Sequence, residues 1–246
     1  IPVSSTGHLI LVGELLGFTG DLASTFTIFI QFGAILAVVV LYWDRFTGLL
    51  RLQETSGFHG SRGLGLLALT SLPGLIGGFL AYATIRDRLF QPWTVAVGLA
   101  VGGVALLAID SLRPEPHIDD LDAVTWRVAL IVGLSQVFAL WPGVSRSAAT
   151  IVGGMLAGVS RKTAAEYSFF AAVPIITAAA LYDLLQSLSF LTAADIPLLA
   201  FGLVASFVAA WFAVRFFIRL VQRYTLRPFG AYRLVVAAAV LLVVAL

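Results

Sequence analysis

The 246-residue sequence contains no cysteine and few charged residues, and each of these features excludes certain kinds of site or protein. Without cysteine the chain forms no disulfide, no thiolate metal site and no thiol nucleophile. Charged residues make up 11% of the chain, whereas a soluble domain carries roughly 25%. Hydrophobic residues make up 60%, and the mean hydropathy is +1.00. The composition therefore predicts a protein that folds in a lipid bilayer.

Lysine is also nearly absent. The fifteen basic residues are Lys162 and fourteen arginines. The net charge is only +2, and the basic residues form no stretch that suits a nucleic-acid backbone. We therefore expect no nucleic-acid partner. The chain opens at Ile1-Pro2 without an initiating methionine, so we expect a fragment that lacks its natural start, and a signal peptide cannot be judged.

Long uncharged runs predict an all-α, polytopic membrane protein with a single integral-membrane domain over residues 1–246. A helix needs about 20 mostly apolar residues to cross about 30 Å of hydrocarbon. Pro73 and Pro174 interrupt two of the runs, where neighbouring helices re-satisfy the freed carbonyls. The six predicted transmembrane helices are Ser24 to Trp43, Gly63 to Ile85, Trp93 to Ile109, Tyr167 to Tyr182, Ile196 to Val214 and Phe229 to Leu246.

Two further segments are too short to span and predict re-entrant helical hairpins. Val128 to Trp141 is an apolar half-length run, and a polar turn separates it from a second short run, Ile151 to Val159. Half-length helices around a polar turn are typical of a hairpin that dips into the membrane and returns to its own side. The opening Pro2 to Phe18 resembles the second half of another hairpin, whose first half is missing from this chain.

The predicted spans sort the loops onto two sides of the membrane. Twelve of the fifteen basic residues fall in four loops on one side, and only Arg86 and Arg88 fall on the other. The positive-inside bias makes the first side cytoplasmic. The first hairpin then enters from the outer side. The four basic loops are Asp44 to Arg62, Asp110 to Arg127, Gly158 to Thr163 and Arg215 to Arg233.

An internal repeat relates the two halves, approximately residues 1–112 and 125–246. A shift of 141 residues places Val3-Ser4 on Val144-Ser145 and Gly17 on Gly158. Each half would be one hairpin followed by three spans, and an odd number of spans inverts the second half in the membrane. Inverted repeats with broken helices place a binding site near their interface, with half-helix N-termini aimed at an anion. We therefore expect the two polar turns to face each other.

The first polar turn, Pro2 to His8, precedes an apolar helix that we expect to begin near Leu9. Free amides at a helix N-terminus attract phosphate. Ser5 and His8 are spaced i, i+3 and so share a helix face, which lets the imidazole activate the serine or attack phosphorus itself. The alternative is that Ser4 or Ser5 only caps the helix and that His8 is a polar interfacial residue.

The second polar turn, Trp141 to Thr150, carries Arg146 at the tip of its hairpin. An arginine within the membrane costs roughly 2.5–3.5 kcal/mol on insertion scales, so it normally has an anionic partner or a wet cavity. Its planar fork suits bidentate contact with phosphate oxygens. The alternative is an arginine that pairs with backbone carbonyls or with a carboxylate such as Glu166. Gln31 and Gln136 are weaker candidates that we expect to hydrogen-bond between helices.

At these two turns the sequence resembles the bacterial undecaprenyl-diphosphate phosphatase family of the BacA (UppP) type. Pro2 to His8 matches the first family signature, and Pro142 to Ser147 with Thr150 matches the second. Leu140-Trp141 and Tyr232-Arg233 are similar as well, and the resemblance covers essentially the whole chain. Two long signatures at the expected separation form a specific match.

The resemblance implies an enzyme that hydrolyses undecaprenyl diphosphate to undecaprenyl phosphate and inorganic phosphate. This reaction recycles the lipid carrier for cell-wall synthesis and confers bacitracin resistance, because the drug sequesters the diphosphate. Ser5 and His8 are implied as the catalytic pair and Arg146 as the phosphate clamp. Which of Ser5 and His8 forms the covalent bond stays open, with Ser5 slightly favoured. The substrate-binding residues implied by the signatures are Ser4, Thr6, Gly7, Gly143, Ser145, Ser147 and Thr150.

The resemblance also implies a divalent cation, Mg²⁺ or Ca²⁺, held by a glutamate-rich motif that we expect upstream of Ile1. No metal ligand is predicted within the given chain. The implied partners are the polyprenyl diphosphate and membrane lipids, and a homodimer is left open. We expect a multi-pass protein of the bacterial plasma membrane whose site opens to the extracytoplasmic side. A transporter or lipid-phosphate flippase is the alternative function, because an inverted repeat suits both.

Overall fold

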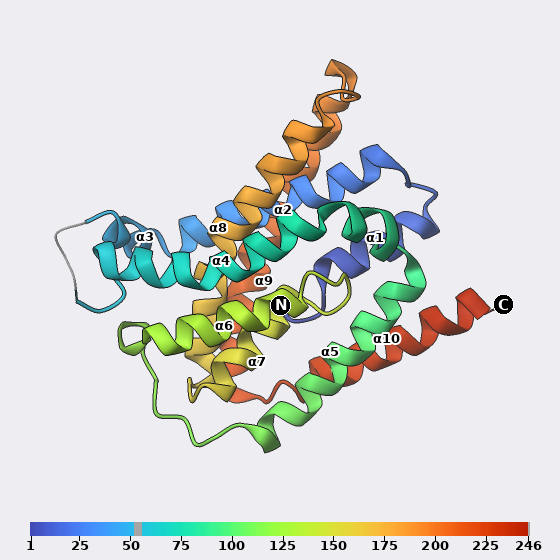
Figure 1. The fold of residues 1–246 in the computed structure, drawn as a ribbon. Helices are drawn as coiled ribbons and strands as arrows, with labels where there is room; N and C mark the ends of the chain where they lie inside the picture. Colours follow the sequence, from blue (N-terminus) through green and yellow to red (C-terminus); the bar gives the residue numbers. More distant parts are fainter. Residues whose placement is uncertain (52–55, 246) are drawn as a thin grey trace.

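The computed structural model describes residues 1–51 and 56–245, apart from the side chains of residues 86, 244 and 245 (Figure 1). This part of the chain is helical with no strand, which confirms the all-α prediction. The α-helices are α1 (Ser5–Leu15), α2 (Asp21–Leu41), α3 (Trp43–Leu49), α4 (Gly60–Thr84), α5 (Pro92–Leu112), α6 (Trp126–Phe138), α7 (Arg146–Leu156), α8 (Arg161–Ser187), α9 (Ile196–Arg223) and α10 (Arg227–Ala245). Short turns η1 (Ile85–Leu89), η2 (Leu121–Ala123) and η3 (Ala193–Asp195) join some of them.

Each of the six predicted spans coincides with one of the long helices. Within the described residues, α2, α4, α5, α8 and α9 are long and apolar enough to cross a membrane. The sixth predicted span coincides with α10, but Leu246 lies outside the described residues, and a crossing by α10 stays a prediction. Pro73 and Pro174 lie inside α4 and α8 as expected, because neither proline ends its helix.

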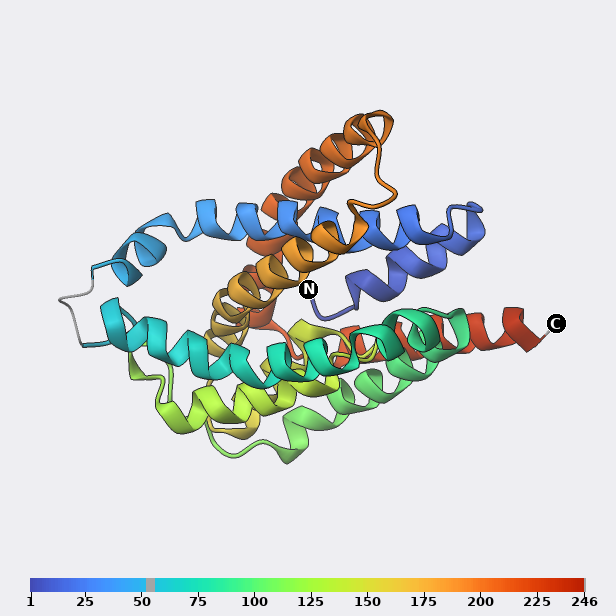
Figure 2. The same cartoon turned by 45° about the horizontal axis from the view of Figure 1, so that its top comes forward.

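The directions of the helices follow from their contacts. The hydroxyls of Thr25 in α2 and Ser187 in α8 are 2.7 Å apart, and at the other end of α2 the Tyr42 ring meets Phe170 of α8. These helices therefore run antiparallel. The helices α5 and α10 are antiparallel too, because Gly103 packs on Gly230 whereas Val95 lies in one cluster with Ala237. Figures 1 and 2 both show α10 beside α5 along its length.

Helices α6 and α7 form a helical hairpin. Gly153 of α7 packs on Ser135 of α6. The segments that enter and leave the hairpin meet at an isolated bridge between Ile118 and Val159. Both ends of the hairpin therefore lie together, as the predicted second hairpin requires. Its return within a bilayer stays a prediction.

Both hairpin helices start earlier than the apolar pattern predicts, so the expected starts near Leu9 and Ile151 are wrong. Helix α1 begins at Ser5, and α7 begins at Arg146. The reason is capping, because the Ser4 hydroxyl accepts from the Gly7 amide at 3.4 Å and the Ser145 hydroxyl accepts from the Ala148 amide at 3.3 Å. The polar residues of both signatures consequently lie in the first turns of helices.

The 141-residue repeat reappears in the backbone. Helices α1 and α7 have the same length, 11 residues, and start 141 positions apart. Their N-caps, Ser4 and Ser145, have φ values of 70° and 73°, and the glycines that follow the helices, Gly17 and Gly158, have φ values of 66° and 83°. The corresponding helices α2 and α8 are antiparallel, as an inverted repeat demands. The exact limits of the halves stay a prediction.

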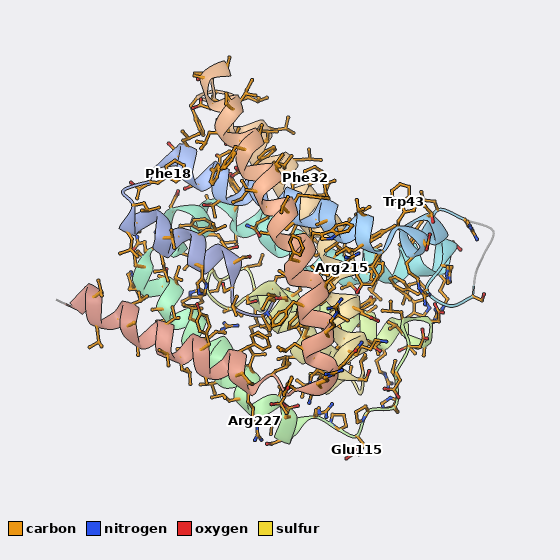
Figure 3. All side chains as sticks on the ribbon, turned by 180° about the vertical axis from the view of Figure 1, so that it is seen from behind. Phe18, Phe32, Trp43, Glu115, Arg215 and Arg227 are labelled. Carbon is orange, nitrogen blue, oxygen red and sulfur yellow. The ribbon has the colours of Figure 1, made fainter. Side chains whose placement is uncertain are left out.

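The ends of the helices sort onto two sides of the molecule. In Figure 3, Trp43, Glu115 and Arg227 lie toward one end and Phe18 toward the opposite end, which agrees with the predicted division of the loops. One basic residue was placed wrongly by the sequence. Arg233, counted with the loop from Arg215, is fully buried in α10 and belongs to no surface loop.

Candidate active site

A cavity of about 1020 Å³ brings the two signature turns together. Its walls come from α2, α4, α8 and α9, and the first turns of α1 and α7 lie against it. Eight of the ten predicted site residues line it, Arg146 among them, which places both halves of the repeat at one site. The lining residues of the two turns are Ser4, Ser5, Thr6, His8, Gly143, Ser145, Arg146 and Ser147.

The two turns also touch each other directly. A Cβ added at Gly7 would lie 3.0 Å from the Ser4 hydroxyl and 3.5 Å from Gly143 Cα, so Gly7 fills the contact between the turns. Thr150 lies behind the second turn, where its hydroxyl donates to the Ser168 hydroxyl at 2.8 Å. Neither Gly7 nor Thr150 lines the cavity. We therefore assign them to support of the turns instead of direct substrate contact.

Ser4 and Ser145 hold an unfavourable backbone conformation at this contact. They are the only described non-glycine residues with positive φ. Such a conformation costs about 1–3 kcal/mol and persists only where the surroundings enforce it. Gly143, with φ of 100°, lies within the second turn, where a side chain would meet the Val95 carbonyl. The turns are therefore held in place, and the first-turn amides of α1 and α7 point outward without intrahelical acceptors.

Arg146 faces the cavity without a carboxylate partner among the described residues. Its Nη1 donates to the Ser168 carbonyl at 2.8 Å, which uses one of five guanidinium donors. Of the two alternative partners, the structure therefore shows a backbone carbonyl, whereas the carboxylate of Glu166 instead lies 4.0 Å from Lys162. One backbone carbonyl thus orients Arg146, and its positive charge is left for an anion in the cavity.

The predicted hydrogen bond between Ser5 and His8 is not formed. His8 Nδ1 lies 2.9 Å from the Ser4 carbonyl, and His8 Nε2 lies 2.8 Å from the Tyr232 hydroxyl. Both ring nitrogens therefore have partners other than Ser5. Ser5 itself is exposed and lines the cavity. The i, i+3 spacing puts the two side chains on one face of α1, but the imidazole turns toward α10.

Arg233 is a functional residue whose role the sequence analysis missed. It is 0% exposed, and its guanidinium donates to backbone carbonyls of both turns: Pro2 at 3.2 Å, Gly143 at 2.6 Å and Val144 at 2.8 Å. It also donates to Gly98 at 3.2 Å and Leu99 at 3.3 Å in α5. A single buried cation therefore fastens the first turn, the second turn and α5 to α10.

A pair of small residues in α5 makes room for this arrangement. A Cβ at Gly98 would collide with the Pro142 carbonyl, and a Cβ at Gly102 would collide with the Arg233 guanidinium. Glycines four apart permit close helix packing in membranes. This spacing, with an arginine inside the last apolar run, was the signal in the sequence that could have located the contact.

The two glutamines behave differently from each other. Gln136 of α6 donates to the Thr70 carbonyl of α4 at 3.1 Å, which confirms the expected bond between helices. Gln31 donates to the Thr27 carbonyl of its own helix at 3.1 Å, so the predicted interhelical role has no support there. Both side chains line the cavity.

The residues of the cavity do not by themselves fit a divalent cation. Across residues 1–51 and 56–245, no three His, Asp or Glu side chains converge in a way that could hold a metal. Asp183 is a carboxylate on the wall, and it accepts from the Tyr82 hydroxyl at 2.9 Å. Mg²⁺ and Ca²⁺ prefer several oxygen ligands, carboxylates above all. We derive no chemical step through a cation.

Comparison with known proteins identifies the family. The family model described as "Bacitracin resistance protein BacA" matches residues 1–239. The chain belongs to the BacA family. An undecaprenyl-diphosphatase of Nitratidesulfovibrio vulgaris (strain DP4) is 57% identical over 98% of this chain and 91% of the relative. Proteins of the same name from Desulfovibrio desulfuricans and Solidesulfovibrio magneticus are 55% and 52% identical, over 96% and 98% of this chain and 89% and 91% of theirs.

Membership of the BacA family agrees with the geometry. The stretches that resemble the family signatures are the two turns that meet at the cavity, and Tyr232-Arg233 contacts both of them. Residues far apart in the sequence thus form one site.

Proposed function

We propose that this chain hydrolyses undecaprenyl diphosphate to undecaprenyl phosphate and inorganic phosphate in the bacterial plasma membrane. The observation that carries the proposal is the convergence of two helix N-termini and Arg146, which lacks a carboxylate partner in the described chain, on one cavity. Such a site attracts a phosphate through amides, helix dipoles and a fixed cation. The names of the relatives supply the diphosphate lipid as the substrate.

The positive groups of the site would stabilise the reacting phosphate. In phosphoryl transfer, most catalysis comes from positioning and from charges that stabilise the phosphoryl oxygens. Arg146 has donors left after its bond to Ser168, and the amides of Ser5 and Ser147 lie in the first turns of α1 and α7. These groups would bind the terminal phosphate and orient it for in-line attack.

Ser5 is our candidate nucleophile and His8 its base. The Ser5 oxygen would form a bond to the terminal phosphorus as the bond from phosphorus to the bridging oxygen breaks. The lipid monophosphate leaves, and the Ser5 proton passes to His8 Nε2. Water then hydrolyses the phosphoserine and releases inorganic phosphate. His8 as the nucleophile is the other assignment.

The shape of the cavity supports an opening toward the extracytoplasmic side. Its lining includes Ser24 near the start of α2, Tyr82 near the end of α4 and Asp183 near the end of α8. These ends lead to the loops with few basic residues, which the positive-inside bias places outside. The remaining walls are mainly apolar and would accept the polyprenyl tail between the helices.

A purified-protein assay tests this function. Full-length protein in detergent should release phosphate from undecaprenyl diphosphate. The Arg146→Lys variant should lose roughly 100-fold in kcat/KM, the order found when one transition-state donor is removed, because lysine cannot offer a bidentate fork. Arg219→Lys, an exposed arginine of α9, is the matched control. Wild-type turnover by Arg146→Lys would disprove the clamp.

The inverted repeat also supports a second candidate function, transport or flipping of a lipid phosphate. The matched caps of α1 and α7 and the antiparallel α2 and α8 are the observations that favour it. The same assay separates the two, because a hydrolase releases phosphate in detergent without two compartments and a pure carrier does not. The divalent cation implied by the resemblance is kept as a separate proposal that needs ligands beyond the described residues.

A further inference from the structure

Tyr232 contacts the proposed base from outside the cavity. Its hydroxyl lies 2.8 Å from His8 Nε2, the two ring centroids are 5.6 Å apart, and the ring planes differ by 9°. His8 lines the cavity and Tyr232 does not. One side of the imidazole therefore faces the cavity, and the other contacts Tyr232 of α10.

The two hydrogen bonds of His8 determine where its proton lies. The Ser4 carbonyl can only accept, so His8 Nδ1, 2.9 Å away, must carry a hydrogen. In the neutral ring Nε2 is then the unprotonated nitrogen, and the Tyr232 hydroxyl donates to it. The partner of one ring nitrogen thereby sets the role of the other.

The position of Tyr232 is itself fixed by its neighbour. Arg233 donates to carbonyls of Pro2, Gly143 and Val144 and is fully buried. This stretch of α10 is thus fastened to both signature turns. The Tyr232 hydroxyl consequently reaches His8 from a backbone that the site itself holds in place.

We propose that Tyr232 is a positioning residue for the reaction, and that it presents His8 with Nε2 as the proton-accepting nitrogen. The inference rests on the proposed function, in which His8 acts as the base. Before turnover the Tyr232 hydroxyl donates to Nε2 and fixes the tautomer of the ring. In the reacting complex Nε2 exchanges this donor for the hydroxyl of Ser5, whose proton it accepts.

A kinetic experiment tests the role of the hydroxyl. Tyr232→Phe keeps the aromatic ring and removes the oxygen, so His8 Nε2 loses its hydrogen-bond donor. We expect kcat to fall at least about tenfold, part of the 10²–10⁴-fold that a positioned base contributes, while KM stays unchanged because Arg146 and the turn amides are untouched. Tyr224→Phe, an exposed tyrosine between α9 and α10, is the matched control and should keep wild-type kcat.

A spectroscopic experiment tests the hold on His8 independently of turnover. Nitrogen-15 NMR of labelled protein in detergent should show His8 as a single tautomer with hydrogen on Nδ1, assigned by loss of the signal in His8→Ala. In Tyr232→Phe the signal should show mixed tautomers or exchange broadening. In Tyr232→Phe, an unchanged His8 signal or an unchanged kcat would overturn the proposal. A lowered Tm together with a raised KM would also overturn it, because that result would indicate a merely structural role. If His8→Ala keeps full activity, the proposed function of His8 fails instead, and the NMR result still reports on Tyr232.

Discussion

The first residue of α1 is Ser5 and the first residue of α7 is Arg146, and these two occupy the same place in the two repeat halves. Their N-caps are both serine with positive φ, yet the side chains that follow differ in chemistry. One half contributes a hydroxyl and an imidazole, and the other contributes a guanidinium. The backbone of the repeat is therefore symmetric, whereas the chemistry of the site is divided between the halves.

Arg233 is the residue whose replacement should affect fold and activity together. Arg233→Lys keeps the positive charge but loses the planar fork that reaches carbonyls of both turns. We expect a Tm several degrees lower and a clear loss of phosphate release, because each buried acceptor left without a donor costs about 1–3 kcal/mol. Thermal unfolding in detergent and the phosphate assay provide the measurements.

The matched control for this variant is Arg227→Lys, at the start of the same helix, where the arginine donates to the Ser111 hydroxyl at 3.3 Å in an exposed position. It should leave Tm and activity near wild type. Equal effects of the two substitutions would show that Arg233 has no special role at the turns.

The sequence predicted which residues lie at the cavity better than it predicted their contacts. Arg146 could be recognised in the sequence because a charge in an apolar hairpin is costly unless it has a partner or a wet cavity. The structure places Arg146 at the cavity, with no carboxylate partner among the described residues. The partner of His8 could not be read from local spacing, because Tyr232 is 224 positions away. Arg233 was misplaced for the same reason, since its acceptors come from segments that only the tertiary fold brings together.

At the scale of the helix, α9 should govern access for the tail of the substrate. Four of the five residues that α9 contributes to the cavity wall are small, Ser206, Ala209, Ala210 and Ala213, and the fifth is Val214. Ala213→Phe would fill this part of the cavity, so kcat/KM for undecaprenyl diphosphate should fall about tenfold or more, as expected when binding space is overfilled. A short isoprenoid such as farnesyl diphosphate should be affected less. The comparison of the two substrates is the measurement.

Ala205→Phe tests whether the position on α9 matters. Ala205 is exposed and does not line the cavity, so its replacement should leave both substrates unaffected. An equal loss for both substrates in Ala213→Phe, or the same loss in Ala205→Phe, would contradict a role for this wall in binding the tail.

Asp122 of η2 links two segments that lie outside the predicted spans, α3 and the loop before α4. Its carboxylate accepts from Arg45 at 3.0 Å and from the Phe58 amide at 2.7 Å. Burial raises the pKa of Asp122, but the Phe58 amide and Arg45 lower it more, and the net pKa lies below its ordinary value. The stabilisation is therefore present above the unfolded-state pKa of about 3.9 and is lost as the pH falls through the lower folded-state pKa.

Asp122→Asn should consequently lower Tm at neutral pH, and the difference from wild type should shrink as the pH falls below about 4. Thermal unfolding across a pH series measures both proteins. Glu115→Gln, an exposed carboxylate in the loop before η2, is the control and should show no pH-dependent difference. A constant Tm difference at every pH would exclude this ionic contribution.

The elements themselves were predictable because the apolar runs are long, whereas their ends were not. The hydropathy of α7 rises only after its first turn, so the pattern placed the start at Ile151 although Ser145 caps the helix six residues earlier. The same polar first turn hid the start of α1. Helices such as α1 and α7 begin with polar residues that periodicity assigns to loops, and capping chemistry is the better signal.

For the whole molecule, the absence of cysteine makes orientation directly measurable, since an introduced cysteine is the only thiol. Ser189 and Glu115 are exposed residues in loops that the prediction places on opposite sides of the membrane. In intact cells a membrane-impermeant maleimide should label Ser189→Cys, and it should label Glu115→Cys only after the membrane is opened. The reverse pattern would show that the site faces the cytoplasm.

The anchoring by Arg233 has a consequence for how the protein is made. The helix that carries it follows every other element described in this chain, yet its guanidinium joins the two turns on which the site depends. During synthesis the ribosome delivers both turns long before α10. A nascent chain already inserted in the membrane would therefore stay inert toward lipid diphosphates until α10 docks against both turns.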